Sequence, residues 1–355
     1  MRPEAGPEAG KTIVSKADKV TIRTVAEDAG VSVTAVSNVL RDAYGVSDAM
    51  REKVLISIAK LGYRPSTAAR AMRGRTYTVG VLALDIANPF ISELVGGIQE
   101  AIEAASFKLM IGVGRGQSRL EGDLIETMID TRMDGLVLVA PHLEPQTLDR
   151  FSRQLPLILI GHHEAKAGSF DTANCDDEDG ARMAVRALYR AGHRDIRMIS
   201  LPHRDLSDSD VSIRREAGYR AEMTALGLAD RVSVTPDDIG EAVSRTTGET
   251  IAQRMQALLR SVPKPVAFFC WSDLHAITLI DEARAMGLDV PGQVAVIGFD
   301  NAPSAGLRSV GLSSIDQNGR TLGAKAGQLL LERINGRTEA RHVLIPPSLV
   351  IRPSI

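Results

Sequence analysis

Polar and aromatic side chains follow the strand-like apolar runs between residues 78 and 300, and they indicate what the chain could bind. Asp85 follows TVGVLAL, His162 follows LILIG and Asp300 follows VAVIGF, while the same positions after other runs hold Arg115, His142, Trp271, Ser272 and Asp273. Ligands bind at the carboxyl ends of strands in open parallel sheets. Carboxylates accept hydroxyl groups and an indole can lie against the apolar face of a sugar ring, so this set favours a polyhydroxylated small molecule.

Other chemistries fit the sequence less well. His162-His163-Glu164 contains adjacent histidines that point to opposite sides of a strand end and lack the i, i+4 spacing of a helical zinc site. Gly112, Gly114 and Gly116 depart from the dinucleotide-binding fingerprint. We find no nucleophile elbow, no phosphate-binding P-loop and no convincing Cys/His or Ser/His/Asp set. The sequence therefore predicts no metal, no cofactor and no enzymatic activity.

The elements that position these residues alternate between apolar strands and amphipathic helices from Thr78 onward. We expect a first series of βα units up to LILI and a second series after Cys175, which ends at VAVIG. Units of this length specify parallel sheets with right-handed crossovers. Two series predict an α/β core of two lobes, each a doubly wound parallel sheet, with HVLIPPSLVIR as one last strand.

A different pattern occupies Val20–Leu40, which reads as two short helices around a tight turn. An apolar stripe of Ile22, Val25, Ala26 and Ala29 predicts the first helix, Gly30 ends it, and Ser32 can cap the second. The second helix leaves Val33, Thr34, Ser37 and Asn38 outward. Short hydrogen-bonding side chains near a helix N-terminus suit base edges and phosphates. The alternative is a helical hairpin whose polar face meets only water.

The chain resembles the LacI family of bacterial transcription regulators, of the type with a helix-turn-helix and a periplasmic-binding-protein-like core. The likeness extends from about residue 20 to near the end of the chain. Its specific motifs are Val20-Thr21-Ile22, Val25-Ala26, Ala29-Gly30-Val31-Ser32, Val36-Ser37, Val46-Ser47, Arg51-Glu52-Lys53-Val54, Tyr63-Arg64-Pro65, Ala69-Arg70 and Met72-Arg73-Gly74.

The resemblance implies a helix-turn-helix domain at 19–64 and a hinge helix at 65–76 that folds in the minor groove of a near-palindromic operator. Met72 stands where the family has a wedging leucine, and Asn38 stands where many relatives carry an arginine, so adenine is the expected contact. The implied partners are double-stranded DNA and a second copy of the chain. The implied DNA-binding residues are Thr21, Arg23, Ser32, Val33, Thr34, Ser37, Asn38, Tyr63, Ala69, Met72 and Arg73.

The resemblance also implies that residues 77–355 hold an effector in a cleft between lobe 1 (about 77–175 plus 318–335) and lobe 2 (about 176–316 plus 340–355). Ser272-Asp273 replaces the family's usual Asn-Asp. A lone Asp or Arg after a strand is more often a helix cap or surface ion pair, so the assignment depends on the joint pattern. The implied effector-binding residues are Asp85, Asn88, Phe90, His162, Arg215, Trp271, Ser272, Asp300 and Gln317.

Composition agrees with this interpretation. Residues 19–76 hold ten basic and five acidic side chains within a chain of net charge -2, which concentrates phosphate attraction at the helix-turn-helix. Cys175 and Cys270 fit no disulfide or metal pattern, and no export or membrane segment is recognised, so we expect a cytoplasmic protein. Residues 1–18 have the composition of a disordered tail.

The expected function is that of a sugar-responsive transcription regulator, most simply a repressor, acting as a homodimer. Two alternatives remain at this point. A DNA-independent sugar-binding protein shares the core but needs an export signal and no basic head. An enzyme on the same scaffold is the weaker alternative, since fold alone does not dictate function.

Overall fold

The computed structural model describes residues 20–40, 43–63, 74–201, 210–236 and 250–355. Its contacts divide the chain into residues 1–74 and 75–355, called here the head and the core. Arg75 and Thr76, which the sequence assigned to the hinge, therefore belong to the core. The predicted tail at 1–18 and the hinge residues Ala69, Met72 and Arg73 lie outside the described residues.

The described part of the head contains the helices α1 (Ile22–Ala29), α2 (Val33–Leu40) and α3 (Asp48–Leu61). The predicted cap and helix end are present: the Ser32 hydroxyl accepts from the Ala35 N–H at 3.1 Å, and Gly30 ends α1 at φ 64°. Thr21, which was not predicted as a cap, caps α1. A small core between the helices comprises Val25, Ala26, Val36, Val39, Val54 and Tyr63.

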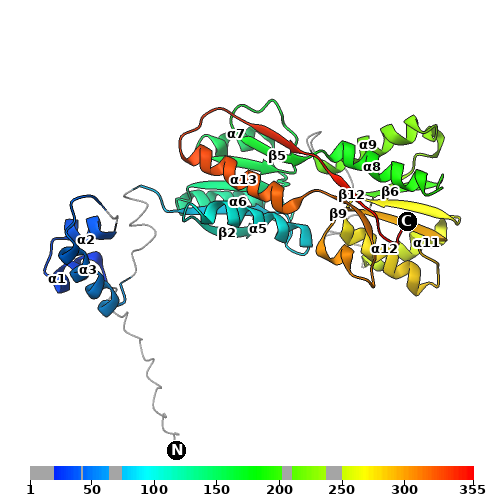
Figure 1. Cartoon of the computed structure of the whole chain (residues 1–355). Coiled ribbons are helices and arrows are strands. Elements are labelled where there is room, and N and C mark those ends of the chain that lie inside the picture. The colour runs from blue at the N-terminus through cyan, green and yellow to red at the C-terminus, as the bar shows by residue number, and fades with distance from the viewer. Residues whose placement is uncertain (1–19, 41–42, 64–73, 202–209, 237–249) are drawn as a thin grey trace, which may run out of the picture. The chain divides into compact units, whose positions relative to one another are not determined.

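Lobe 1 of the core is a six-stranded parallel sheet in the order β11-β5-β4-β3-β1-β2 (Figure 1). The central strands β1, β3 and β4 are apolar and buried because helices pack against them, whereas the edge strand β2 is largely exposed. The elements are β1 (Thr78–Ala83), α5 (Pro89–Glu103), β2 (Lys108–Val113), α6 (Ser118–Asp130), β3 (Gly135–Val139), α7 (Pro145–Ser152), β4 (Leu157–Ile160), β5 (Asp171–Cys175), α13 (Gly319–Ile334) and β11 (His342–Ile345).

Lobe 2 repeats the architecture with the order β12-β10-β9-β8-β6-β7, in which only β12 is antiparallel to its neighbour. Its elements are α8 (Asp177–Arg190), β6 (Ile196–Ser200), α9 (Val211–Ala225), the 3₁₀ turn Ala229–Arg231, β7 (Val234–Pro236), α11 (Ile251–Ser261), β8 (Val266–Cys270), α12 (Asp273–Ala285), β9 (Val294–Asp300), the 3₁₀ turn Pro303–Gly306, β10 (Ser313–Asp316) and β12 (Ser348–Val350). The two-lobed α/β fold class predicted from the sequence is confirmed.

The expectation of one last strand in lobe 2 is wrong. β11 pairs parallel with β5 in lobe 1, and after Pro346-Pro347 the chain enters lobe 2 as β12 beside β10. Proline has no N–H for a ladder, so the pair separates the two strands. Residues 342–345 therefore belong to lobe 1, and the lobe boundary at 340 is corrected accordingly.

Candidate effector site and DNA-binding surface

Asp300 connects three of the predicted effector residues. It ends β9, is 5% exposed, and accepts hydrogen bonds from Gln317 Nε2 at 2.6 Å and from Asn88 Nδ2 at 3.3 Å. Asn88 caps α5 of lobe 1, whereas Gln317 lies between β10 of lobe 2 and α13 of lobe 1. The contacts therefore cross from one lobe to the other. A carboxylate held by two amides can exchange them for the hydroxyl groups of a ligand.

Burial sets the acidity of this carboxyl. Burial raises the pKa of Asp300 to about 6, although Arg215 and the amides of Asn88 and Gln317 act in the opposite direction. A charged carboxylate loses hydration when it is removed from water, and amide donors replace only part of it. Asp300 therefore changes charge within a mildly acidic range.

Arg215 is buried on α9 and already has an anionic partner. Its Nε donates to Asp177 Oδ1 at 2.7 Å, and the guanidinium lies 3.7 Å from the ring centroid of Phe299 and 5.8 Å from that of Trp271. His163 Nε2 lies 2.8 Å from the second oxygen of Asp177. Burial acts to raise the pKa of Asp177, but Arg215 and His163 hold it below its usual value. Asp177 therefore neutralises the charge of Arg215.

Asp177, His163 and Phe299 complete this group, and the sequence did not single them out for it. Asp177 stands in the acidic run Asp176-Asp177-Glu178-Asp179, which is typical of a helix N-terminus, and Asp176 does cap α8. Asp177 differs from the other acidic residues of this run in being buried, with 1% of its surface exposed. The adjacent histidines were predicted to point to opposite sides of the strand end, and they do contact different residues. His163 contacts Asp177, while the His162 ring lies edge-on to Phe170.

After β8, the side chains of Trp271 and Ser272 both contact the buried His275. Trp271 Nε1 donates to His275 Nε2 at 3.2 Å, and the Ser272 hydroxyl lies 3.0 Å from His275 Nδ1. Asp273 accepts from the Ser314 hydroxyl at 2.6 Å and from the Ala302 N–H at 2.7 Å. Ser272 is 1% exposed, so it supports Trp271 from within the lobe.

Three further predicted residues stand apart from Asp300. Asp85 is exposed and accepts from the Ala87 N–H at 2.9 Å, which forms a local turn. Phe90 is 8% exposed and belongs to the lobe 1 core, where its ring faces Gly319 at the start of α13. His162 is 5% exposed, and burial lowers its pKa. Phe90 and His162 therefore both pack within lobe 1, and their contact with an effector stays a prediction.

The predicted DNA-binding residues that are described fall into two groups. Thr21, Arg23, Ser32, Val33 and Thr34 are exposed on the head, and Asn38 is half-buried on α2. Ser37 and Tyr63 are each 8% exposed, and Tyr63 packs in the core of the head. The ring of Tyr63 is covered because its position after Gly62 directs it between the helices, so it acts as a packing residue there.

Comparison with known proteins identifies the class. Residues 21–66 match the family model of bacterial regulatory proteins, lacI family, and residues 185–355 match a periplasmic binding protein-like domain. The chain is 31% identical over 337 residues to the ribose operon repressor of Haemophilus influenzae, covering 94% of this chain and 98% of that protein. It is equally 31% identical over 342 residues to the HTH-type transcriptional repressor PurR of Salmonella typhi, covering 94% and 96%.

Solved structures of transcription regulators also match nearly the whole chain. A lac repressor dimer bound to operator and the anti-inducer ONPF has a TM-score of 0.77 at 25% identity, covering 95% of this chain and 99% of that chain. A transcriptional regulator CelR–cellobiose complex has a TM-score of 0.66 at 28% identity, covering 95% and 100%.

These findings define a regulator with a helix-turn-helix head and a two-lobed binding core. The chain belongs to the LacI family of bacterial regulatory proteins. It is a DNA-binding transcriptional repressor of that family and not an enzyme, and the alternative of a DNA-independent binding protein is overturned by the match over residues 21–66. No helix in the described ranges is long and apolar enough to cross a membrane.

Proposed function

We propose that the protein is a homodimeric, cytoplasmic repressor of a near-palindromic operator and that its effector is a neutral sugar. The observation that carries the effector class is the Asp300 network, in which one buried carboxylate accepts from the amides of Asn88 and Gln317 across the two lobes. Carboxylate and amide groups match the donor and acceptor pairs of vicinal hydroxyls. Trp271, half-buried beside Arg215, offers a ring face for the apolar side of a sugar.

Charge favours a neutral ligand over an anionic one. Asp177 already neutralises Arg215, and Asp300 adds a second carboxylate near the same guanidinium. A sugar phosphate or sugar acid placed here meets repulsion from these carboxylates, and burial makes unpaired like charges costly. The ribose operon repressor and the CelR–cellobiose complex among the relatives support a carbohydrate.

A thermal-shift screen tests this proposal. The full chain is incubated with neutral pentoses, hexoses and disaccharides, with the corresponding sugar phosphates, and with purine bases. A true effector present at about 100 times its Kd stabilises the protein by about 2.7 kcal/mol through mass action. We expect the largest rise in Tm with a neutral sugar, and we expect Asp300→Asn to reduce it. A response confined to phosphates or purine bases refutes the neutral-sugar assignment.

For the head, we propose that α2 reads the major groove with Thr34, Asn38 and Val33, supported by phosphate contacts from Thr21, Arg23 and Ser32. The exposure of Val33 and Thr34 beside the cap of α2 supports this assignment. The roles of Ala69, Met72 and Arg73 in the minor groove remain part of the proposal. Gel shifts at several salt concentrations test it, because phosphate contacts predict a steep loss of affinity as salt rises.

For the homodimer, we propose the edge of the lobe 1 sheet as the contact between subunits. β2 is the edge strand of this sheet, and it exposes Met110 at 54% and Ile111 at 48%. A groove beside it is lined by Val95, Gln99, Glu103, Phe107, Lys108, Leu109 and Ile111. Exposed apolar side chains on an edge strand are a surface that soluble proteins usually cover.

A further inference from the structure

We propose that Arg75 is a positioning residue for operator binding, because it anchors the chain that leaves the head onto the end of α13. Arg75 Nη1 donates to Asn335 Oδ1 at 2.8 Å, and Nη2 donates to the Ile334 carbonyl at 2.6 Å. Ile334 is the last residue of α13 and Asn335 is its C-cap. The first residue of the core is therefore held on one particular helix end of lobe 1.

Thr76 and Thr78, which follow Arg75, are also held to lobe 1 by hydrogen bonds. Thr76 is 3% exposed and donates from its N–H and its hydroxyl to the two oxygens of Asp134, at 3.2 and 2.9 Å. The N–H of Thr78 donates to Asp134 as well, at 3.1 Å. These contacts hold the chain at the start of β1, so the position of Arg75 follows that of lobe 1.

The same helix begins at the effector site. Gln317, two residues before α13, donates to Asp300, and α13 then runs for 16 residues to the seat of Arg75. At about 1.5 Å per residue this helix spans about 24 Å. α13 therefore connects the proposed effector contact with the anchor of the head by one continuous element.

α13 moves together with α5 because their backbones are in contact. A Cβ at Gly323 would lie 2.1 Å from the Leu94 carbonyl oxygen, and one at Gly97 would lie 2.0 Å from that of Arg320. Figure 1 shows the two helices side by side across lobe 1. Asn88, the N-cap of α5, also contacts Asp300. Packed interiors are not continuously deformable, so a change at Asp300 shifts the pair as a unit.

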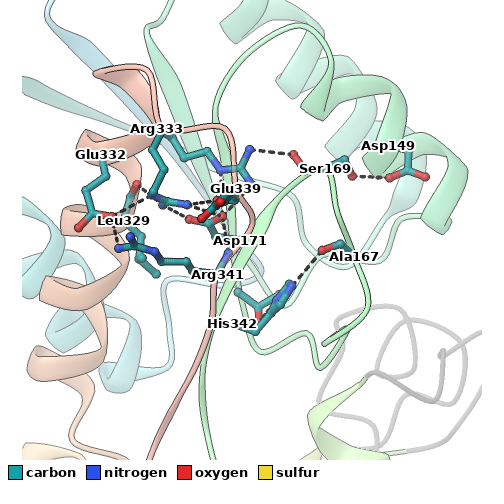
Figure 2. Close-up of polar contacts among 12 residues, drawn as sticks. Asp149, Ala167, Ser169, Asp171, Leu329, Glu332, Arg333, Glu339, Arg341 and His342 are labelled. Atoms are coloured by element: carbon teal, nitrogen blue, oxygen red, sulfur yellow. Dashed lines mark hydrogen bonds and ion pairs between the residues drawn. The ribbon is translucent and has the colours of Figure 1, made fainter.

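A buried ion cluster fixes the far end of α13. Arg333 Nε donates to Asp171 Oδ1 at 2.9 Å, Arg337 binds the same carboxylate, and Asp171 is fully buried (Figure 2). The Arg341 N–H adds a third donor to Asp171 at 3.0 Å. These contacts prevent fraying next to Ile334 and Asn335. The seat of Arg75 is therefore a fixed point of lobe 1 rather than a loose helix end.

Operator affinity of full-length variants tests the anchor, with a duplex that the wild-type protein selects from a random-sequence pool. We expect Arg75→Gln and Asn335→Ala each to weaken binding about five-fold or more, the scale of a typical coupling between sites. Because both remove the same contact, the double variant is expected to lose no more than the stronger single variant. The control Arg260→Gln, an exposed arginine of lobe 2, is expected to stay within about two-fold.

Salt dependence separates anchoring from a direct phosphate contact. Removing an arginine that contacts a phosphate lowers the slope of log affinity against log salt concentration by about one. Removing a positioning residue leaves this slope unchanged. We expect an unchanged slope for Arg75→Gln and for Asn335→Ala, at a Tm close to that of the wild type. Asn335→Ala binding within two-fold of wild type, or a lower slope for Arg75→Gln, overturns the assignment.

The link along α13 rests on the proposed effector site and has its own test. A double-mutant cycle of Gln317→Ala and Arg75→Gln measures operator affinity without any sugar. We expect the two losses to be non-additive by more than two-fold, because both act on α13. Additive losses overturn the link along α13. The sugar-induced rise in Tm, measured in parallel on the wild type, reports on the effector site independently of this cycle.

Discussion

In the proposed operator complex, single side chains on α2 decide which bases the head reads. Asn38 carries an amide that can donate to and accept from adenine, and it lies one helical turn beyond the exposed Thr34. We expect Asn38→Ala to cost about 1–3 kcal/mol and to relax specificity at one adenine-bearing position of each half-site. Binding to a set of base-substituted duplexes measures this effect.

A matched control for Asn38 is Arg23, which is exposed on α1. Arg23→Gln is expected to weaken binding to all duplexes by a similar factor and to reduce the salt slope by about one, as loss of a phosphate contact does. Unchanged discrimination at every base position in Asn38→Ala would show that another side chain reads the adenine.

The buried carboxyl of Asp300 is expected to make effector binding pH-dependent. Its pKa of about 6 lies above that of an unfolded-chain aspartate, about 3.9. The ionised form accepts hydroxyl groups, so sugar affinity is expected to rise with pH through about 6 and to level off above 7. Titration calorimetry from pH 5 to 8 measures this, and Asp300→Asn is expected to remove the step.

The ligand-free protein is expected to respond to pH in the opposite direction. A raised pKa means that the folded state binds the proton of Asp300 more tightly than the unfolded state does, so this group stabilises the fold increasingly as pH falls from about 6 toward 4. The charges of Arg215 and Asp177 act on the pKa of Asp300, and Asp300 in turn raises the pKa of Asp273. Comparison with the Asp300→Asn variant therefore isolates the contribution of Asp300 to the pH dependence of stability. Sugar affinity that is constant between pH 5 and 7 contradicts a direct contact with Asp300.

At the scale of elements, the contact between α5 and α13 depends on glycine. Gly323→Ala places a methyl group 2.1 Å from the Leu94 carbonyl oxygen, so the helices must separate. We expect a loss of about 1–3 kcal/mol in the free energy of unfolding, the usual cost of overpacking. Urea unfolding followed by circular dichroism measures this loss.

Gly122 of α6 is the matched control, since a Cβ there meets no atom within 4 Å. Gly122→Ala is expected to stabilise the protein by about 0.5–1 kcal/mol through helix propensity alone. If Gly323→Ala is also neutral or stabilising, the close contact of the two helices is not required for stability.

The elements differ in how far the sequence specified them. α1 was predicted well, because its apolar stripe and the Gly30 that ends it can be read from the sequence. β5 and β10 were missed, because their polar residues, such as Asp171, Asn174 and Ser313, interrupt the apolar pattern. Asp171 and Ser313 are buried with hydrogen-bond partners from distant segments, Arg337 and the Arg352 carbonyl, which local sequence does not reveal.

For the whole molecule, the exposed edge strand β2 predicts the oligomeric state. We expect the mass of two subunits in dilute solution, measured by light scattering. Ile111→Glu places a charge on the apolar surface and is expected to give monomers. The same variant should weaken operator binding strongly, because two heads bind a palindrome together.

The exposed residue Ile86, which is 67% exposed in lobe 1, provides the control for this experiment. Ile86 belongs neither to β2 nor to the residues that line the groove beside it, so Ile86→Glu is expected to leave the dimer intact. A wild-type mass of four subunits, or an Ile111→Glu variant that stays dimeric, contradicts the proposed surface.

The sequence by itself predicted the first two helices of the head and the two βα series of the core, because caps and apolar periodicity are local properties. The resemblance to the LacI family also implied Asp300, Asn88 and Gln317 as effector-binding residues, and that role stays a prediction. Only the tertiary structure decided that these three meet, that Asp177 neutralises Arg215, and that Arg75 is seated on α13. These partners are separated by 17 to 260 residues, and contacts at such distances are fixed by packing rather than by any local pattern.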